Sequence, residues 1–193
     1  MRAYIQKCND PPVNILVSIG GQHQGVYGFP KCPGGNSYFC DAARRLLNMG
    51  AYLSFVQNRL VQAQYWHDPN QRERYLQNNI FLPDLNNEIE GRRNESYKRN
   101  LMKLKKFVMV RFTKDSMVEP PISQHFGFYK DGQAKEVEPL RETKLYQEDW
   151  LGLKKMDGEG KLVFLDIEDD HLRFSLQWLL DEIIKKYFIN SEK

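Results

Sequence analysis

Three short, nearly continuous apolar runs interrupt an otherwise mixed pattern of polar and apolar positions. They cover Val13–Ile19, Phe107–Phe112 and Leu162–Ile167. Apolar runs of strand length without strict alternation are typical of strands that are buried on both faces of a parallel sheet. We therefore expect these three segments to be neighbouring strands of a parallel sheet in an α/β fold.

Apolar residues at helical spacing predict helices between and after these strands. Residues 1–7 have the pattern of the end of a helix, and the two prolines at 11 and 12 stop it. The segment 42–47 has a cap at Asp41 and a stop at Gly50. Further helices are expected over 52–65, 70–75, 96–106 and 172–188.

The remaining segments are predicted to be turns and loops. Phe126–Tyr129 and Ala134–Val137 flank an Asp-Gly pair at 131 and 132, which favours a short hairpin. Residues 78–93 are polar and 152–160 are rich in glycine, so we expect both to be irregular.

The spacing of the strands predicts a helical insertion. A plain crossover between parallel strands needs only about a dozen residues, whereas the interval from Gly20 to Lys106 is much longer and shows no strand pattern. We expect residues 26–104 to form a helical cap, and residues 1–25 and 105–193 to form the α/β core.

Composition and charge narrow the range of functions. The 193 residues carry a net charge of only +3 and are 41% hydrophobic, which is typical of a folded globular chain. The basic residues are scattered, which argues against binding to nucleic acid. No apolar run approaches the ~20 residues that a membrane-spanning helix needs, and the N-terminus has no apolar region of the signal-peptide kind.

Two residues with catalytic potential follow two of the predicted strands. Asp115 comes just after Phe107–Phe112, and His171 just after Leu162–Ile167. Parallel strands open onto the same edge of a sheet, and this order of acid and histidine is that of an α/β-hydrolase triad. The alternatives are that Asp115 is a turn residue and that His171 starts a helix capped by Asp169 or Asp170.

We find no serine or cysteine in the sequence with the motif expected of the nucleophile in such a triad. The motif Gly-x-Ser-x-Gly does not occur; Ser18 and Ser37 each have only one of the two flanking glycines. Cys8 follows a helix end rather than opening a helix. Metal chemistry is not favoured either, because the histidines at 23, 67, 125 and 171 lie far apart in sequence.

The remaining two cysteines and one asparagine bear on the cellular compartment of the protein. Cys32 and Cys40 flank a short turn, and their spacing fits either a small disulfide loop or two unrelated buried thiols. Asn94-Glu95-Ser96 is a sequon for N-glycosylation. Together these features favour the secretory pathway.

Several long segments resemble those of one family, the lysosomal palmitoyl-protein thioesterases of type 1. The similarity extends from near Met1 to about Phe188. The segments that carry it are VSIGGQHQGV at 17–26, LVQAQYWHDP at 60–69, FGFY at 126–129, GQAKE at 132–136 and DHL at 170–172.

The resemblance implies an α/β-hydrolase that removes palmitate and other long-chain acyl groups from protein cysteines. It assigns Asp115 as the catalytic acid and His171 as the catalytic histidine. It further implies a Cys32–Cys40 disulfide, glycosylation at Asn94, and a lipid-binding role for the cap. The implied substrates are S-palmitoylated proteins or peptides and long-chain acyl thioesters. The implied location is the lysosome, with secretion from the cell as well. The resemblance implies no cofactor.

The sequence departs from the family at its front. Family members have a signal peptide, several strands and a Gly-x-Ser-x-Gly elbow before the segment that corresponds to Met1. We therefore expect an incomplete, C-terminal part of an α/β-hydrolase that is inactive by itself because the serine is missing. The alternative is a non-catalytic truncated isoform or an acyl-binding fragment.

Overall fold

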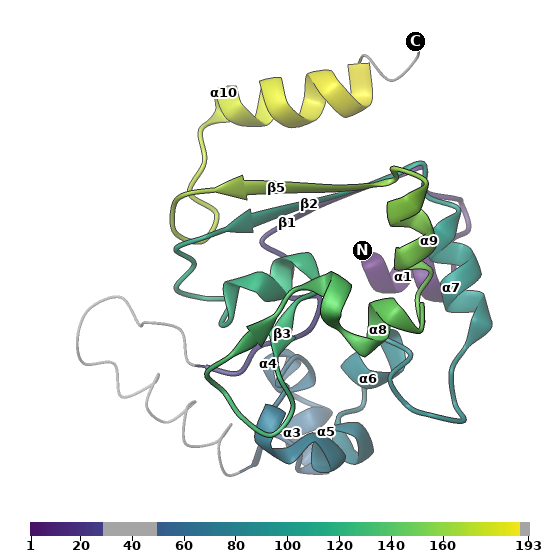
Figure 1. Ribbon diagram of the computed structural model, residues 1–193, viewed down its shortest axis with the longest axis vertical. Helices are drawn as coiled ribbons and strands as arrows, with labels where there is room; N and C mark the ends of the chain where they lie inside the picture. Colours follow the sequence, from purple (N-terminus) through teal and green to yellow (C-terminus); the bar gives the residue numbers. More distant parts are fainter. Residues whose placement is uncertain (29–49, 190–193) are drawn as a thin grey trace.

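The computed structural model describes residues 1–28 and 50–189. Its centre is a parallel sheet of three strands, β1 (Ile15–Ile19), β2 (Lys106–Phe112) and β5 (Leu162–Ile167), in the order β1-β2-β5 (Figure 1). The α/β class and the three predicted strands are confirmed. Because all three strands run in the same direction, the loops that follow them lie at one edge of the sheet.

The central strand has the burial that its sequence predicts. Phe107, Val108, Met109 and Val110 of β2 are completely buried. The outer strands β1 and β5 are only partly buried, since each has one neighbouring strand among the described residues.

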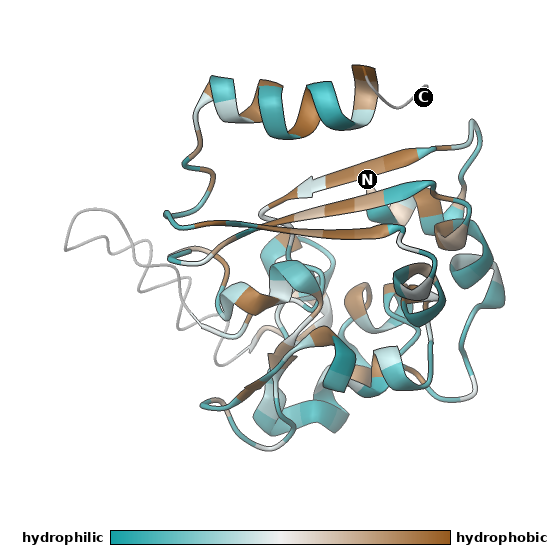
Figure 2. Cartoon of the chain, turned by 45° about the horizontal axis from the view of Figure 1, so that its top comes forward, coloured by the Kyte–Doolittle hydropathy of each residue, from teal (hydrophilic) through white to brown (hydrophobic). Residues whose placement is uncertain are grey.

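The two faces of the sheet have different partners. One face contributes Leu16, Phe107 and Met109 to a large core that also holds Leu101 and Leu153 from the helical segments. The opposite face, with Val108 and Val110, packs against the C-terminal helix. Figure 2 shows the apolar strands lying between that helix and the rest of the chain.

The C-terminal helix starts later than predicted. It begins as the α-helix α10 (Leu176–Trp178) and continues as the π-helix η4 (Leu179–Ile189). Ser175 sets the start, because its hydroxyl accepts a hydrogen bond from the backbone N–H of Trp178 at 3.0 Å. Leu172, four residues before the first helical residue Leu176, has a left-handed backbone conformation with φ +57°.

The segment before β2 is a series of short helices below the sheet (Figure 1). The first helix of the chain, α1 (Arg2–Lys7), confirms the prediction for 1–7. The others are α3 (Ser54–Gln57), α4 (Val61–Gln64), η1 (Pro69–Gln71), α5 (Arg72–Asn78), α6 (Leu82–Leu85) and α7 (Glu95–Met102). The turn α6 lies within residues 78–93, which the sequence predicted to be irregular.

The prediction of one helix over 52–65 is wrong. Two short helices form there instead. At the break between them, the backbone carbonyl oxygen of Gln57 accepts a hydrogen bond from the side-chain amide of Gln64 at 2.8 Å. The buried amide of Gln57 donates to the carbonyl oxygens of Ala51 and Ala63. Asn79 donates to the carbonyl oxygen of Gln64 at the end of α4.

The segment between β2 and β5 contains the predicted hairpin and several short helices that were not predicted. The hairpin pairs β3 (Phe128–Tyr129) with β4 (Val137–Glu138), antiparallel. Residues 152–160, expected to be a loop, contain α9 (Leu153–Gly158), whose Leu153 and Met156 are fully buried in the main core. The other elements are η2 (Pro121–His125), η3 (Leu140–Glu142) and α8 (Lys144–Gln147).

The described structure does not test some of the predictions made from the sequence. The helix over 42–47 and the residues Cys32 and Cys40 lie outside the described residues. The division into a core and a cap at 26–104 stays a prediction. Among residues 1–28 and 50–189, no helix has the length and apolar character needed to cross a membrane.

Candidate active site

The fold brings Asp115 and His171 together at the edge where β2 and β5 end. The Nδ1 atom of His171 lies 2.7 Å from Oδ2 of Asp115. The Asp115 side chain is fully buried, whereas that of His171 is 24% exposed. A buried carboxylate thus contacts an imidazole that solvent reaches, which is the geometry that an acid–histidine pair needs.

Local hydrogen bonds fix the carboxylate of Asp115 in place. Its Oδ1 accepts from the backbone N–H groups of Met117 and Val118, both at 2.7 Å. Asp115 is therefore a turn residue, as one alternative held, and its second oxygen is free to accept from His171.

Gln124 is a site residue that the sequence did not reveal. Its Nε2 donates to Oδ2 of Asp115 at 3.0 Å, and its Oε1 accepts from the backbone N–H of Phe112 at 3.0 Å. It is 1% exposed and comes from η2. No motif marks it, because its contact arises only when η2 folds back against the end of β2.

The loop after β5 is tied to the loop after β2 through Asp170. One oxygen of Asp170 accepts from the backbone N–H groups of Ser116 at 2.8 Å and His171 at 2.7 Å. The side-chain hydroxyl of Ser116, followed by the backbone N–H groups of His171 and Ser116, lowers the pKa of Asp170 to about 2. Asp170 thus holds the backbone of the histidine against the segment that carries the acid.

Gly20, the residue after β1, packs against the imidazole. A Cβ atom on Gly20 would lie 2.9 Å from Cε1 of His171, and the backbone there has φ +70°. Because L side chains rarely adopt this φ and no space is left for a side chain, glycine is required at this point.

A second histidine lies deeper at the same edge. His23 stacks on Phe126 with ring centroids 4.5 Å apart, and its Nε2 has no hydrogen-bond partner within the described part of the chain. Burial lowers the pKa of His23 well below 6.5. The imidazole, together with Arg2 and Ser18, lines a pocket of about 300 Å³.

The remaining candidates lie apart from this pair. Cys8 is exposed and free. Asn94 is exposed and caps α7 by accepting from the backbone N–H of Ser96 at 2.9 Å. Residues 1–28 and 50–189 contain no group of three or more His, Cys, Asp or Glu side chains that could hold a metal ion. Within the same residues, no serine or cysteine side chain is hydrogen-bonded to His171.

Comparison with known proteins extends these observations. The family model described as palmitoyl protein thioesterase matches residues 1–171. The chain is 53% identical to palmitoyl-protein thioesterase 1 of Caenorhabditis elegans and 35% identical to palmitoyl-protein thioesterase 3 of Dictyostelium discoideum. Each match covers 98% of this chain and 62% of the relative.

A more distant relative is lysosomal thioesterase PPT2-B of Xenopus laevis. It is 29% identical over 86% of this chain and 56% of its own length. The chain therefore spans about three fifths of the length of these three relatives.

Proposed function

Because the chain belongs to the palmitoyl protein thioesterase family, we propose that it is part of an enzyme that hydrolyses the thioester between a long-chain acyl group and a protein cysteine. The substrates are S-palmitoylated proteins or peptides and related long-chain acyl thioesters. The single observation that supports the assignment of its residues is the 2.7 Å hydrogen bond between His171 and the buried Asp115.

The proposed mechanism follows from which nitrogen of His171 contacts the carboxylate. Asp115 accepts the Nδ1–H hydrogen bond, so Nε2 keeps its lone pair and acts as the base. Nε2 takes the proton of a serine hydroxyl as the oxygen attacks the thioester carbon. The C–S bond then breaks, the proton passes to the leaving thiolate, and the acyl group stays on the serine.

The second half of the reaction uses the same two residues. Nε2 of His171 takes a proton from water as the water oxygen attacks the acyl-serine. The carboxylic acid leaves and the serine regains its proton. Asp115 stays ionised throughout and stabilises the imidazolium.

The serine itself is proposed to come from outside this sequence, which contains no Gly-x-Ser-x-Gly motif. The 193 residues then supply the acid and the base, and turnover requires a nucleophile held against Nε2 of His171. We further propose a lysosomal location, supported by the name of the Xenopus relative, with a Cys32–Cys40 disulfide, a glycan on Asn94 and a lipid-binding cap over residues 26–104.

A chimera tests this proposal. The part of the Caenorhabditis relative that lies outside the match is joined to this chain, and hydrolysis of a palmitoyl thioester is measured. We expect turnover by the chimera and none by the 193 residues alone. Asp115→Asn is expected to reduce turnover by roughly 10⁴-fold, and His171→Ala to abolish it.

The matched control is Asp181→Asn, which removes one carboxylate charge from the exposed face of η4 and is expected to leave turnover unchanged. Turnover that survives His171→Ala, or turnover by the 193 residues alone, would contradict the assignment.

A further inference from the structure

A second pocket lies between the short helices and the hairpin segment, away from the acid–histidine pair. It has a volume of about 470 Å³. Its walls come from α5, the turn after α6, the hairpin and the segment 138–150, together with Gln24 and His67. Neither Asp115 nor His171 lines it. The pocket is distinguished by the charged side chains Arg72, Glu88, Lys130, Asp131, Glu138 and Glu142.

Glu88 presents one unbonded carboxylate oxygen from a buried position. Its side chain is 3% exposed. Oε1 accepts from the hydroxyl of Tyr75 at 2.9 Å and from the amide of Asn86 at 3.0 Å. Within residues 1–28 and 50–189, Oε2 accepts no hydrogen bond, and its nearest cation is Arg72 at 3.8 Å.

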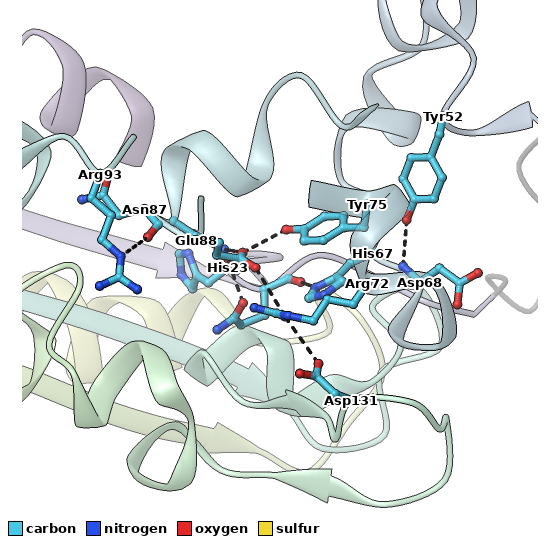
Figure 3. A network of polar contacts seen from close by, with 12 residues as sticks. His23, Tyr52, His67, Asp68, Arg72, Tyr75, Asn87, Glu88, Arg93 and Asp131 are labelled. Carbon is cyan, nitrogen blue, oxygen red and sulfur yellow. Dashed lines mark hydrogen bonds and ion pairs between the residues drawn. The ribbon is translucent and has the colours of Figure 1, made fainter. Parts of the chain in front are cut away.

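Arg72 is too loosely held to compensate this charge. Figure 3 shows it between Glu88 and Asp131, and its Nη1 atom is 3.4 Å from Oδ1 of Asp131. One guanidinium is thus shared between two carboxylates, and neither receives a short, two-pronged contact. A buried carboxylate without a close cationic partner is costly, and burial raises the pKa of Glu88.

The rest of the pocket adds more negative than positive charge. Glu138 and Glu142 form no ion pair in the described part of the chain, and Lys130 is bound to Glu136, which does not line the pocket. Burial, followed by the charges of Asp131 and Glu142, raises the pKa of Glu138. Lys144 is the only further cation among the lining residues.

His67 forms a rigid, uncharged part of the wall. Its ring lies between Tyr75, at a centroid distance of 3.9 Å, and Phe128, at 4.2 Å. Its Nδ1 contacts the carbonyl oxygen of Gln24 at 2.7 Å. Burial lowers the pKa of His67 to about 3, so this imidazole brings no positive charge to the pocket at neutral pH.

We propose that this pocket binds an organic cation, a guanidinium or primary ammonium group, with Oε2 of Glu88 as its buried anchor and Glu138 and Asp131 at its mouth. A guanidinium fits carboxylates through paired N–H donors. A metal ion is the less suitable occupant, because no group of three suitable side chains surrounds one point in the described residues. The site does not depend on the thioesterase proposal.

The test is calorimetric titration of the full 193-residue chain with agmatine, which carries both cationic groups. We expect saturable binding that Glu88→Gln weakens about tenfold or more, since Gln keeps the contacts with Tyr75 and Asn86 but removes the charge. Glu138→Gln, at the more exposed mouth, is expected to weaken it as well and does not disturb the buried anchor.

The matched control is Glu90→Gln, which removes the same charge from an exposed position two residues from Glu88. It is expected to bind agmatine like the parent chain. Absence of agmatine binding, equal binding by the parent and both pocket variants, or tighter binding of inorganic phosphate than of agmatine would each overturn the proposal.

Discussion

Gln124 donates to Oδ2 of Asp115, the same carboxylate oxygen that accepts the hydrogen bond of His171. The acid is therefore held by three protein donors besides the imidazole, because Oδ1 accepts from the N–H groups of Met117 and Val118. This arrangement fixes which oxygen faces His171. It also makes the site sensitive to residues that no triad motif contains.

Replacing Gln124 is expected to destabilise the chain. Gln124→Leu leaves the buried N–H of Phe112 and one acceptor site of Asp115 without a partner, at a cost of about 1–3 kcal/mol. Urea unfolding of the two chains measures the difference. Gln77→Leu, at an exposed position, serves as the control, and an equal effect of the two substitutions would contradict the role given to Gln124.

Gly20→Ala is expected to displace the imidazole of His171. The added methyl group would lie 2.9 Å from Cε1 of His171, which is too close for the ring to keep its present position beside Asp115. Gly91→Ala is the control, since Gly91 has φ +74° and nothing within 4 Å of the added atom. The backbone cost of both substitutions is about 1 kcal/mol or more.

The NMR signals of the His171 ring distinguish the two glycine variants. We expect them to shift in Gly20→Ala and to stay unchanged in Gly91→Ala. Unchanged ring signals in Gly20→Ala would show that the loop yields without affecting the histidine.

Protonation of His67 in the unfolded state is expected to lower the stability of the folded chain in mild acid. Its pKa is about 3 in the folded chain and near 6.5 when unfolded. Between these values only the unfolded state binds the proton, so stability falls as the pH is lowered through 6.5 towards 3. The loss is about 1.4 kcal/mol for each pH unit well below 6.5.

Comparison with His67→Phe isolates this contribution, because phenylalanine keeps the stack between Tyr75 and Phe128 but does not titrate. We expect the free energy of unfolding to fall more steeply from pH 7 to pH 4.5 in the parent chain. Parallel pH curves for the two chains would contradict a neutral, buried His67.

The strands and the site edge could be predicted because their cause is local in the sequence. A run such as Phe107–Val110 is apolar at every position since β2 is buried on both faces. The residues that follow parallel strands share one edge, so Asp115 and His171 were expected to be neighbours, and they are. Their catalytic roles remain a proposal.

The elements that were missed depend on contacts between distant residues. At the break between α3 and α4 the carbonyl oxygen of Gln57 is bonded by the amide of Gln64, although glutamine has a good helix propensity. The helix α9 lies between glycines, which favour a loop, yet Leu153 and Met156 anchor it in the core. Gln124 and the buried Glu88 became evident only from their partners in the folded chain.

The central claim is that Asp115 and His171 form an acid–base pair with Nε2 of the histidine as the base. Nitrogen NMR of the 193-residue chain at neutral pH tests it most directly, by showing which ring nitrogen of His171 carries the proton. We predict protonation at Nδ1 and a free lone pair on Nε2.

The Asp115→Asn variant sharpens the measurement. The N–H groups of Met117 and Val118 hold the amide oxygen through two short bonds, against one longer bond from Gln124 at the other position. The NH₂ group is therefore expected to face Nδ1 and to move the ring proton to Nε2. We predict this change of tautomer. A parent chain with the proton on Nε2, or a variant with the same tautomer as the parent, would contradict the account.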